Sequence, residues 1–447
     1  MLLGCKGEVI KPDDDAKVFP IFSCEDCDYI VNTHETNGAD LNFKAGSIVC
    51  LKTGETYSNL LFSDIVGEPN NPIIIRNCDG VAVISSTQSF GVKFTGSKHF
   101  KLLGDGGNSE FGIKISTTQG FYLSMEQLTT NFEIAQVEIS GNMSNGIGAG
   151  AGFAGIGVKT SPYQACDLFA DPTRTAWVME NIIIRNNYIH DVGGEGMYIG
   201  HGFYTGRQEN GCSVVTYSHS ITGLRVFDNL IERTGYDGVQ IKNADKDCEV
   251  YNNIIIDYGQ LGESAHNEGL FLGEGVTGKF YNNVIMNGTG NGIQFQGMGN
   301  VDIYGNLVSG AGESGFFGAH GAYVYRIPGG YFNIINNTFV NSGKFGFVFY
   351  NEDGGIKRNV NNIIAGAGEA LNPNGADMVV EGNLLAESPA EIGFVDLKNN
   401  DYQLKSASPA VDKGVDVSTF IDISQDMLGT SRPQGNAIDV GAIEFKQ

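Results

Sequence analysis

The chain has 447 residues, of which 41% are hydrophobic and 18% charged, with 63 glycines and one tryptophan. This composition is typical of a folded, turn-rich protein rather than a disordered one, and the length permits a large core. The net charge of −23 makes nucleic acid and anionic membrane poor partners for the surface. No stretch of 18 apolar residues occurs, so the sequence predicts no membrane-spanning helix.

Residues 1–28 are predicted to form an N-terminal tether. The residues Leu2-Leu3-Gly4-Cys5 resemble the end of a bacterial lipoprotein signal, in which the cysteine is lipidated after cleavage. This resemblance implies contact with a membrane only through a lipid anchor at Cys5. It also implies a secreted, periplasmic or outer-surface location in a Gram-negative bacterium. If Cys5 is lipidated, seven of the eight cysteines remain, so at least one is free or intermolecular.

Cys24 and Cys27 have the spacing of half a zinc site, but no second pair accompanies them. We therefore expect a local disulfide or two free thiols at this place rather than a metal.

Residues 29–395 are predicted to form the body of the protein, and two phrases mark its opening. Residues 41–57 read LNFKAGSIVCLKTGETY, and residues 71–77 read NPIIIRN. These phrases resemble the opening rungs of secreted, Bacteroidetes-type parallel β-helix proteins, including polysaccharide lyases of the chondroitinase-B and alginate-lyase-like group. The resemblance covers about residues 41–104. It implies the fold and a glycan-active lineage, without implying a particular reaction.

Two long stretches interrupt the regular pattern that follows. The first runs from about residue 146 to residue 177, and the second covers about residues 201–223. Long loops in a compact repeat are commonly functional, and in solenoid proteins such insertions gather on one face. We therefore expect a functional site beside them.

An asparagine recurs in the second half of the chain, each time with an apolar residue two places after it. The intervals of 42, 24, 30, 23, 31 and 25 residues indicate a basic period of about 21–25 that is lengthened by insertions. Short alternating segments indicate strands, so the sequence predicts an all-β protein, a single right-handed parallel β-helix. Because stacked rungs lie about 4.8 Å apart, the side chains should hydrogen-bond as a ladder. The members are Asn187, Asn229, Asn253, Asn283, Asn306, Asn337 and Asn362.

A second column is expected where a residue precedes a conserved-offset glycine in each rung. Glu195, Asp237 and Glu268 occupy it on consecutive rungs, and it then becomes neutral at Asn291 and Ser314. Three carboxylates this close either raise a pKa or hold a cation, for which Ca²⁺ is the expected ion. A plainer interpretation stays open, because a turn before glycine also favours Glu, Asp, Asn and Ser.

Basic and aromatic side chains are expected around this column. The candidate catalytic residues lie in the same rungs or in the insertions, and they are Lys242, His201, His266 and Arg207. Outward positions are predicted to contact sugar rings through Tyr198, Tyr236, Gln240 and Phe271. No motif for a nucleotide, flavin or haem is present, so no organic cofactor is expected.

Residues 396–447 are predicted to form a C-terminal cap over the open edge of the last rung. They resemble the closing segment of many Bacteroidetes-type β-helix proteins. With both ends closed in this way, we expect a monomer that binds a polysaccharide or an oligosaccharide.

Three functions are compatible with these features. The first is a lyase that cleaves a uronate-containing glycan by β-elimination, with Lys242 as the base and His201 or Arg207 assisting the leaving group. In it, calcium held by Glu195, Asp237 and Glu268 would neutralise the uronate carboxylate. The second is a glycoside hydrolase that uses paired carboxylates of the same column, which the net charge favours slightly. The third is a non-catalytic, glycan-binding or adhesive surface protein. We take the lyase as the leading prediction.

Overall fold

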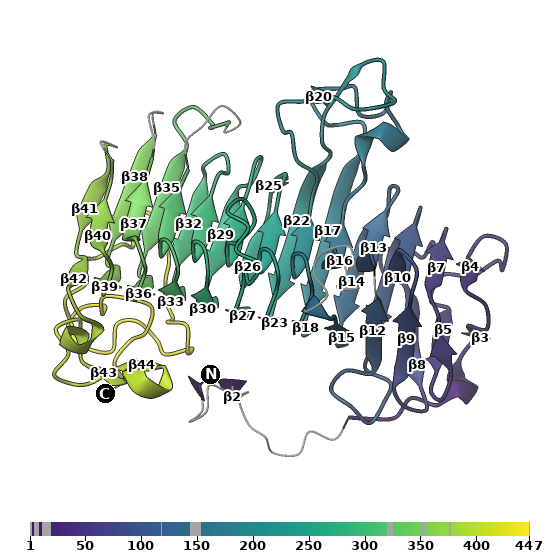
Figure 1. Ribbon diagram of the computed structural model, residues 1–447, viewed down its shortest axis with the longest axis horizontal. Coiled ribbons are helices and arrows are strands. Elements are labelled where there is room, and N and C mark those ends of the chain that lie inside the picture. Colours follow the sequence, from purple (N-terminus) through teal and green to yellow (C-terminus); the bar gives the residue numbers. More distant parts are fainter. Residues whose placement is uncertain are drawn as a thin grey trace.

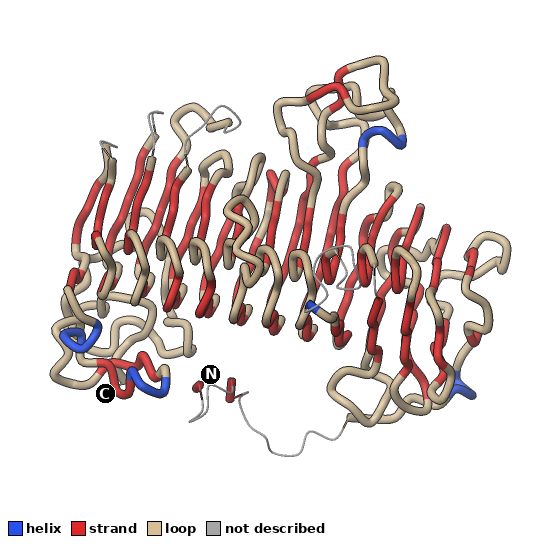
Figure 2. Tube along the Cα trace, in the orientation of Figure 1, coloured by secondary structure: helices blue, strands red, loops and turns tan. Residues whose placement is uncertain are grey.

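The computed structural model describes residues 2–3, 9–10, 19–117, 119–143, 153–319, 325–350, 355–374 and 377–446. Three long parallel sheets run along the molecule, which confirms the single right-handed parallel β-helix (Figure 1). Each rung contributes one strand to each sheet, and Figure 2 shows that strands and loops make up nearly all of the trace. Within the described residues, no helix is long and apolar enough to cross a membrane.

The first sheet begins at the N-terminal end of the body. It consists of β3 (Tyr29–Ile30), β5 (Ile48–Lys52), β8 (Ile73–Cys78), β11 (Lys98–Leu103), β14 (Thr130–Ala135), β17 (Val178–Arg185), β22 (Ser220–Phe227), β26 (Glu249–Tyr251), β29 (Gly278–Tyr281), β32 (Val301–Tyr304), β35 (Tyr331–Ile335), β38 (Ile356–Val360) and β41 (Val379–Glu381), with β25 (Ala244–Lys246) paired to β22.

The second sheet carries the candidate site. It consists of β4 (Glu35–Asn37), β7 (Leu60–Ser63), β10 (Phe90–Thr95), β13 (Phe121–Glu126), β16 (Ala154–Val158), β19 (Met197–Ile199), β24 (Val239–Ile241), β28 (Leu270–Leu272), β31 (Ile293–Phe295), β34 (Phe316–Gly318), β37 (Phe345–Phe349) and β40 (Glu369–Asn372).

The third sheet completes each rung. It consists of β6 (Thr56–Tyr57), β9 (Ala82–Ser86), β12 (Ile113–Thr117), β15 (Val137–Ser140), β18 (Tyr188–His190), β23 (Leu230–Glu232), β27 (Ile254–Ile256), β30 (Val284–Gly288), β33 (Leu307–Ala311), β36 (Thr338–Val340), β39 (Ile363–Ala365) and β42 (Leu384–Ala386).

Short elements lie outside these sheets. They are the antiparallel pairs β1 (Leu2–Leu3) with β2 (Val9–Ile10), β20 (Arg207–Gln208) with β21 (Val215–Thr216) and β43 (Phe394–Asp396) with β44 (Asp401–Leu404), and the 3-10 helices η1 (Cys24–Asp26), η3 (Pro162–Gln164), η4 (Pro389–Ile392) and η5 (Leu397–Asn399).

The asparagine ladder forms as predicted. From Asn187 to Asn362, each amide nitrogen donates to the amide oxygen of the ladder asparagine on the next rung, at 2.9 to 3.3 Å, and the last acceptor is Asn383. The same nitrogens also donate to backbone carbonyls, as Asn283 does to Val250 at 3.0 Å. The apolar residues two places on, such as Ile231 and Ile285, are completely buried. The ladder therefore joins the rungs at the edge of an aliphatic core.

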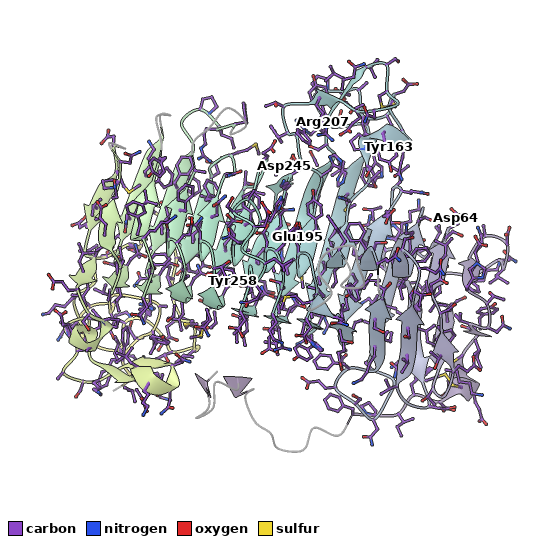
Figure 3. All side chains as sticks on the ribbon, in the orientation of Figure 1. Asp64, Tyr163, Glu195, Arg207, Asp245 and Tyr258 are labelled. Carbon is purple, nitrogen blue, oxygen red and sulfur yellow. A yellow bond between two sulfur atoms is a disulfide. The ribbon has the colours of Figure 1, made fainter. Side chains whose placement is uncertain are left out.

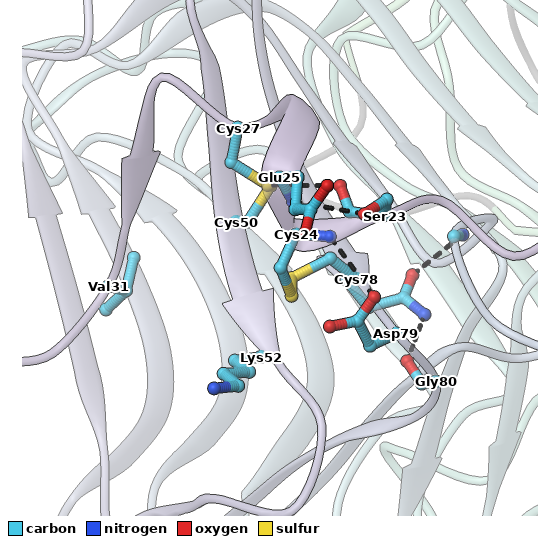
Figure 4. Close-up of a disulfide and its surroundings, with 12 residues drawn as sticks. Ser23, Cys24, Glu25, Cys27, Val31, Cys50, Lys52, Cys78, Asp79 and Gly80 are labelled. Atoms are coloured by element: carbon cyan, nitrogen blue, oxygen red, sulfur yellow. Dashed lines mark hydrogen bonds between the residues drawn. A yellow bond between two sulfur atoms is a disulfide. The ribbon is translucent and has the colours of Figure 1, made fainter.

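Two disulfides fasten the end of the predicted tether to the body. Cys24 is bonded to Cys78 and Cys27 to Cys50, so each cysteine of the pair reaches a different strand (Figure 4). The expectation of a local disulfide or two free thiols is therefore wrong, because strands β5 and β8 place a partner opposite each sulfur. The predicted anchor Cys5 lies outside the described residues. Among the described cysteines, Cys248 is free and buried.

The two insertions lie together and are covalently joined. One leaves the second sheet after β16 and the other after β19, and the disulfide Cys166–Cys212 links them. Backbone contact adds to this, since the Tyr217 N–H donates to the Phe169 carbonyl at 2.8 Å. Both insertions rise beside β17 and β22 (Figure 1), so they gather on one face as expected for a solenoid.

The C-terminal segment lies against the flank of the helix and not over its end. Ile392, Phe394 and Tyr402 belong to one buried cluster with outward residues of the third sheet, among them Ile254 and Met286. The three sheets end at β40, β41 and β42, where three apolar side chains stay 43–48% exposed, namely Val379, Val380 and Leu385. The predicted cover over the last rung is thus replaced by a cover over an apolar sheet face, which buries more apolar surface.

Candidate active site at an acidic column

The acidic column has the register that the sequence predicts. The glycine after each column residue donates its N–H to the column residue of the next rung: Gly196 to Asp237, Gly238 to Glu268 and Gly269 to Asn291, each at 2.9 Å. Glu195, Asp237 and Glu268 therefore occupy the same turn on three consecutive rungs. Their side chains are 2%, 0% and 2% exposed as whole residues, so the carboxyl groups are buried. Figure 3 shows Glu195 at the middle of the rod.

Hydrogen bonds satisfy only part of this column. The Glu268 N–H donates to Asp237 Oδ1 at 2.9 Å, and the Asn267 N–H donates to Glu268 Oε2 at 3.0 Å. Glu195 Oε2 and Asp237 Oδ2 are buried and have no hydrogen-bond partner. A buried polar atom without a partner typically costs about 1–3 kcal/mol. The column is therefore unfavourable for folding, in contrast to an ordinary run of polar turn residues.

The carboxyl groups hold protons more strongly than isolated acids do. Burial raises the pKa of Glu195 to about 7, although the charges of Lys159 and Lys242 oppose the shift. Burial, followed by the negative charge of Glu268, raises the pKa of Asp237 well above its ordinary value. At neutral pH the column therefore carries fewer than three negative charges, and a bound cation would displace its protons.

His266 joins the column from the insertion that precedes β28. Its Nδ1 lies 3.9 Å from Glu195 Oε1, and its ring stacks on Tyr236 with the centroids 5.1 Å apart. Nδ1 is buried and has no hydrogen-bond partner, and burial lowers the pKa of the imidazole. One donor atom each from Glu195, Asp237 and His266 lies within 4.8 Å of the other two. His266 thus takes the place that the sequence assigned to Glu268.

A basic residue that the sequence reading missed, Lys159, lies at the same site. Val158, Ile199 and Ile241 are paired across β16, β19 and β24, so the next residues, Lys159, Gly200 and Lys242, continue three neighbouring strands. The Lys159 ammonium lies 4.0 Å from the centroid of the Tyr198 ring. Burial lowers the pKa of Lys159 to about 8, against the opposing effect of Glu195.

Gly200 separates the two lysines. A Cβ at Gly200 would lie 1.9 Å from the Lys242 carbonyl oxygen, and its φ of +83° is unfavourable for other residues. No side chain can therefore stand between Lys159 and Lys242, and the pair forms a local cationic spot on an acidic protein.

The remaining candidate catalytic residues differ in position. His201 is half-buried at the start of the second insertion, with Nδ1 3.1 Å from the Gly202 carbonyl, and burial lowers its pKa. Arg207 lies on β20, where it forms an ion pair with Glu209 at 2.8 Å and covers the Phe203 ring. Figure 3 shows Arg207 on the insertion, apart from Glu195. The structure therefore does not bring Arg207 to the column.

The predicted substrate-binding residues are less open than their alternation suggests. Tyr198, Gln240 and Phe271 are in register on β19, β24 and β28. Tyr198 is partly exposed, whereas Gln240 and Phe271 are buried, and the Lys242 ammonium lies 5.6 Å from the centroid of the Phe271 ring. The stacking of His266 covers one face of Tyr236. Tyr198 is thus the outward aromatic residue nearest to both a lysine and open solvent.

His219 has a structural place behind Lys159. It is completely buried, its Nε2 accepts the Thr160 N–H at 3.1 Å, and its ring packs edge-on against Trp177. Burial lowers the pKa of His219 to about 3, so the ring stays neutral and can accept this hydrogen bond. The contact fixes the backbone directly after Lys159.

No family model matches the chain, and no curated protein matches it. Similar solved structures include a pectate lyase, which is 15% identical over 92% of this chain and 90% of that chain, with a TM-score of 0.44. An alginate lyase from a Paenibacillus species is 13% identical over 80% of this chain and 99% of that chain, with a TM-score of 0.39. A GH136 lacto-N-biosidase from Eubacterium ramulus is 11% identical over 80% of this chain and 67% of that chain, with a TM-score of 0.45. At such identities the reaction has to be inferred from this chain's own residues.

Proposed function

We propose that this protein cleaves a uronate-containing polysaccharide by β-elimination at the corner formed by Lys159, Tyr198 and Lys242. The observation that carries the proposal is Lys159, a largely buried lysine with a pKa of about 8 that lies over the Tyr198 ring. A lysine with such a pKa is partly neutral near neutral pH and can act as a general base. In this role Lys159 replaces Lys242, the base expected from the sequence.

Each side chain has a separate role in the proposed elimination. Neutral Lys159 removes the proton from the ring carbon that bears the carboxylate. The electron pair of that bond forms a carbon–carbon double bond, and the adjacent bond to the leaving oxygen breaks. Tyr198 protonates the leaving oxygen, because burial raises its pKa to about 12 and keeps the hydroxyl protonated. Proton exchange with water then restores both residues.

The charges at the site support an anionic substrate. The protein carries a net charge of −23, which repels a polyuronate at long range. Lys242 stands two strands from Lys159 with no side chain between them, and its ammonium can pair with the substrate carboxylate. A divalent cation on the acidic column, where Glu195 and Asp237 have unpaired oxygens, would supply further positive charge for the same carboxylate.

A glycoside hydrolase is the second candidate function, and the protonation of the column supports it. Glu195 has a pKa of about 7 and can serve as a general acid. Neighbouring members of the column stand one rung apart, about 4.8 Å between backbones, which is compatible with the carboxyl separation of about 5 Å in retaining enzymes. In this alternative the carboxyl groups carry the chemistry and the lysines only bind.

Mass spectrometry of products separates these functions. The full chain would be incubated with a panel of uronate-containing and neutral glycans, each with and without a chelator. We expect new ends that are lighter by one water and carry an unsaturated uronate, formed only from the uronate-containing glycans. Fully hydrated ends would contradict elimination and support the hydrolase. A complete lack of products across the panel would contradict both enzymes and favour a glycan-binding surface protein.

We also propose that the protein works outside the cytoplasm. Three disulfides, Cys24–Cys78, Cys27–Cys50 and Cys166–Cys212, join its described residues, and such bonds persist mainly in oxidising compartments. A lipid anchor at Cys5 and a monomeric state remain part of this proposal.

A further inference from the structure

We propose that Glu195, Asp237 and His266 form a binding site for a divalent transition metal ion of the zinc class. The inference deepens the proposed function, because the site adjoins Tyr198 and Lys242, but it rests on the donor atoms and not on turnover. It also departs from the calcium site of three carboxylates that the sequence suggests.

The first support is a set of polar atoms that are buried and unpaired. Glu195 Oε2 and Asp237 Oδ2 belong to residues that are 2% and 0% exposed, and neither oxygen has a hydrogen-bond partner. His266 Nδ1 is buried and unpaired as well, although 40% of the His266 side chain is exposed. Native proteins satisfy most buried polar atoms, so three unsatisfied atoms in one place indicate a missing partner. A cation is the partner that suits acceptors alone.

The second support is the spacing of the donors. All three donor atoms lie within 4.8 Å of one another, and His266 Nδ1 lies 3.9 Å from Glu195 Oε1. Bonds of about 2.0–2.2 Å at tetrahedral angles place ligand atoms about 3.3 Å apart. The observed separation therefore needs a movement of about half an ångström, which a partly exposed imidazole can make. The stacking on Tyr236 already sets the plane of the His266 ring.

The chemistry of the donors selects the class of ion. Ca²⁺ takes six to eight oxygen ligands, and imidazole is not among its usual donors. Two carboxylates with one imidazole suit Zn²⁺ and related ions, and three protein ligands leave a position for water or substrate. Glu268 is less available as a ligand, because its Oε2 already accepts the Asn267 N–H. The mixed oxygen and nitrogen set thus favours zinc over calcium.

Metal titration in the absence of substrate tests this site directly. The full chain without a histidine tag would be stripped with chelator, dialysed and titrated with Zn²⁺ or Ca²⁺ by isothermal calorimetry, with the bound metal counted by elemental mass spectrometry. We expect one Zn²⁺ per chain and Ca²⁺ affinity at least about 100-fold weaker. Asp237→Asn and His266→Ala should each weaken Zn²⁺ binding by at least about tenfold, which is the lower range seen even for indirect ligand support.

Matched variants and the calcium arm keep the test decisive. His190→Gln and Glu263→Gln change a histidine outside the column and an exposed acid in the His266 insertion, and both should bind Zn²⁺ as the wild type does. Tight Ca²⁺ binding that His266→Ala leaves unchanged would overturn the proposal in favour of an all-oxygen site. Absence of Zn²⁺ binding, or binding that neither column variant weakens, would also overturn it. Zn²⁺ binding without glycan products would leave this site standing and remove only the proposed function.

Discussion

The asparagine ladder and the acidic column occupy turns of the same rungs, yet their polar atoms are bonded in opposite ways. In the ladder, Asn283 donates to Asn306 and to the Val250 carbonyl, and its own oxygen accepts from Asn253. In the column, Glu195 and Asp237 each keep a buried oxygen without a partner. The comparison shows that position in the repeat does not decide the role of a polar residue. Complete hydrogen bonding marks a structural turn, and incomplete hydrogen bonding marks a site that awaits a proton, an ion or a ligand.

Replacing Lys159 would break the comparison on its catalytic side and should have the largest effect. Lys159→Met keeps the aliphatic stem that packs beside Tyr198 but removes the proposed base, and general base catalysis typically contributes about 10²–10⁴-fold. We expect a loss of that size in kcat with little change in thermal unfolding. Lys246→Met, on an exposed lysine of β25, is the matched control and should keep wild-type activity. Equal activity in Lys159→Met would remove Lys159 from the mechanism.

The pH dependence of the rate sharpens the comparison by showing which group carries the proton. If neutral Lys159 is the base, kcat/KM should rise about tenfold per pH unit below its pKa of about 8 and level off above it. A hydrolase with Glu195 as the acid behaves with the opposite sign, since its rate falls as the pH rises through about 7. A profile of initial rates from pH 5 to 9, checked for unfolding at each end, decides between the two signs.

The fold could be predicted from the sequence because a solenoid repeats its local rules. The ladder asparagines recur at one position of each rung, and a residue that tolerates left-handed backbone precedes them, as Asn252 and Asn282 do with φ of +55°. The position of the acidic column followed from the same alignment of Glu195, Asp237 and Glu268. Periodicity therefore predicted which backbones are stacked.

Periodicity could not predict contacts that depend on side-chain packing between unlike segments. Lys159 escaped notice because its rung lacks a ladder asparagine and Ala154 stands where Glu195 stands on the next rung. Alignment of Gly155 with Gly196 is the signal that would have placed Lys159 level with Lys242. His266 was expected as a catalytic residue, but only the folded insertion shows it reaching the carboxylates. The disulfide partners and the flank position of the C-terminal segment are likewise set by tertiary packing.

A reciprocal exchange of side chains tests the central claim most directly. Asp237→Asn keeps the oxygen that accepts the Glu268 N–H and replaces the unpaired oxygen with a donor. Asn283→Asp does the reverse in the ladder, and sets an oxygen against the Val250 and Asn306 oxygens. Denaturant unfolding would be measured at pH 7 with chelator present, and the Asp237→Asn measurement repeated below pH 4.

We expect Asp237→Asn to raise the free energy of unfolding by about 1 kcal/mol per unit of raised pKa. The raised pKa means that stability falls as the pH rises above about 4, so the gain should disappear below that pH, where Asp237 is protonated in both states. Asn283→Asp should lower the free energy of unfolding by about 1–3 kcal/mol. If Asp237→Asn instead destabilises the protein as Asn283→Asp does, the column is a structural turn like the ladder, and the account given for it is contradicted.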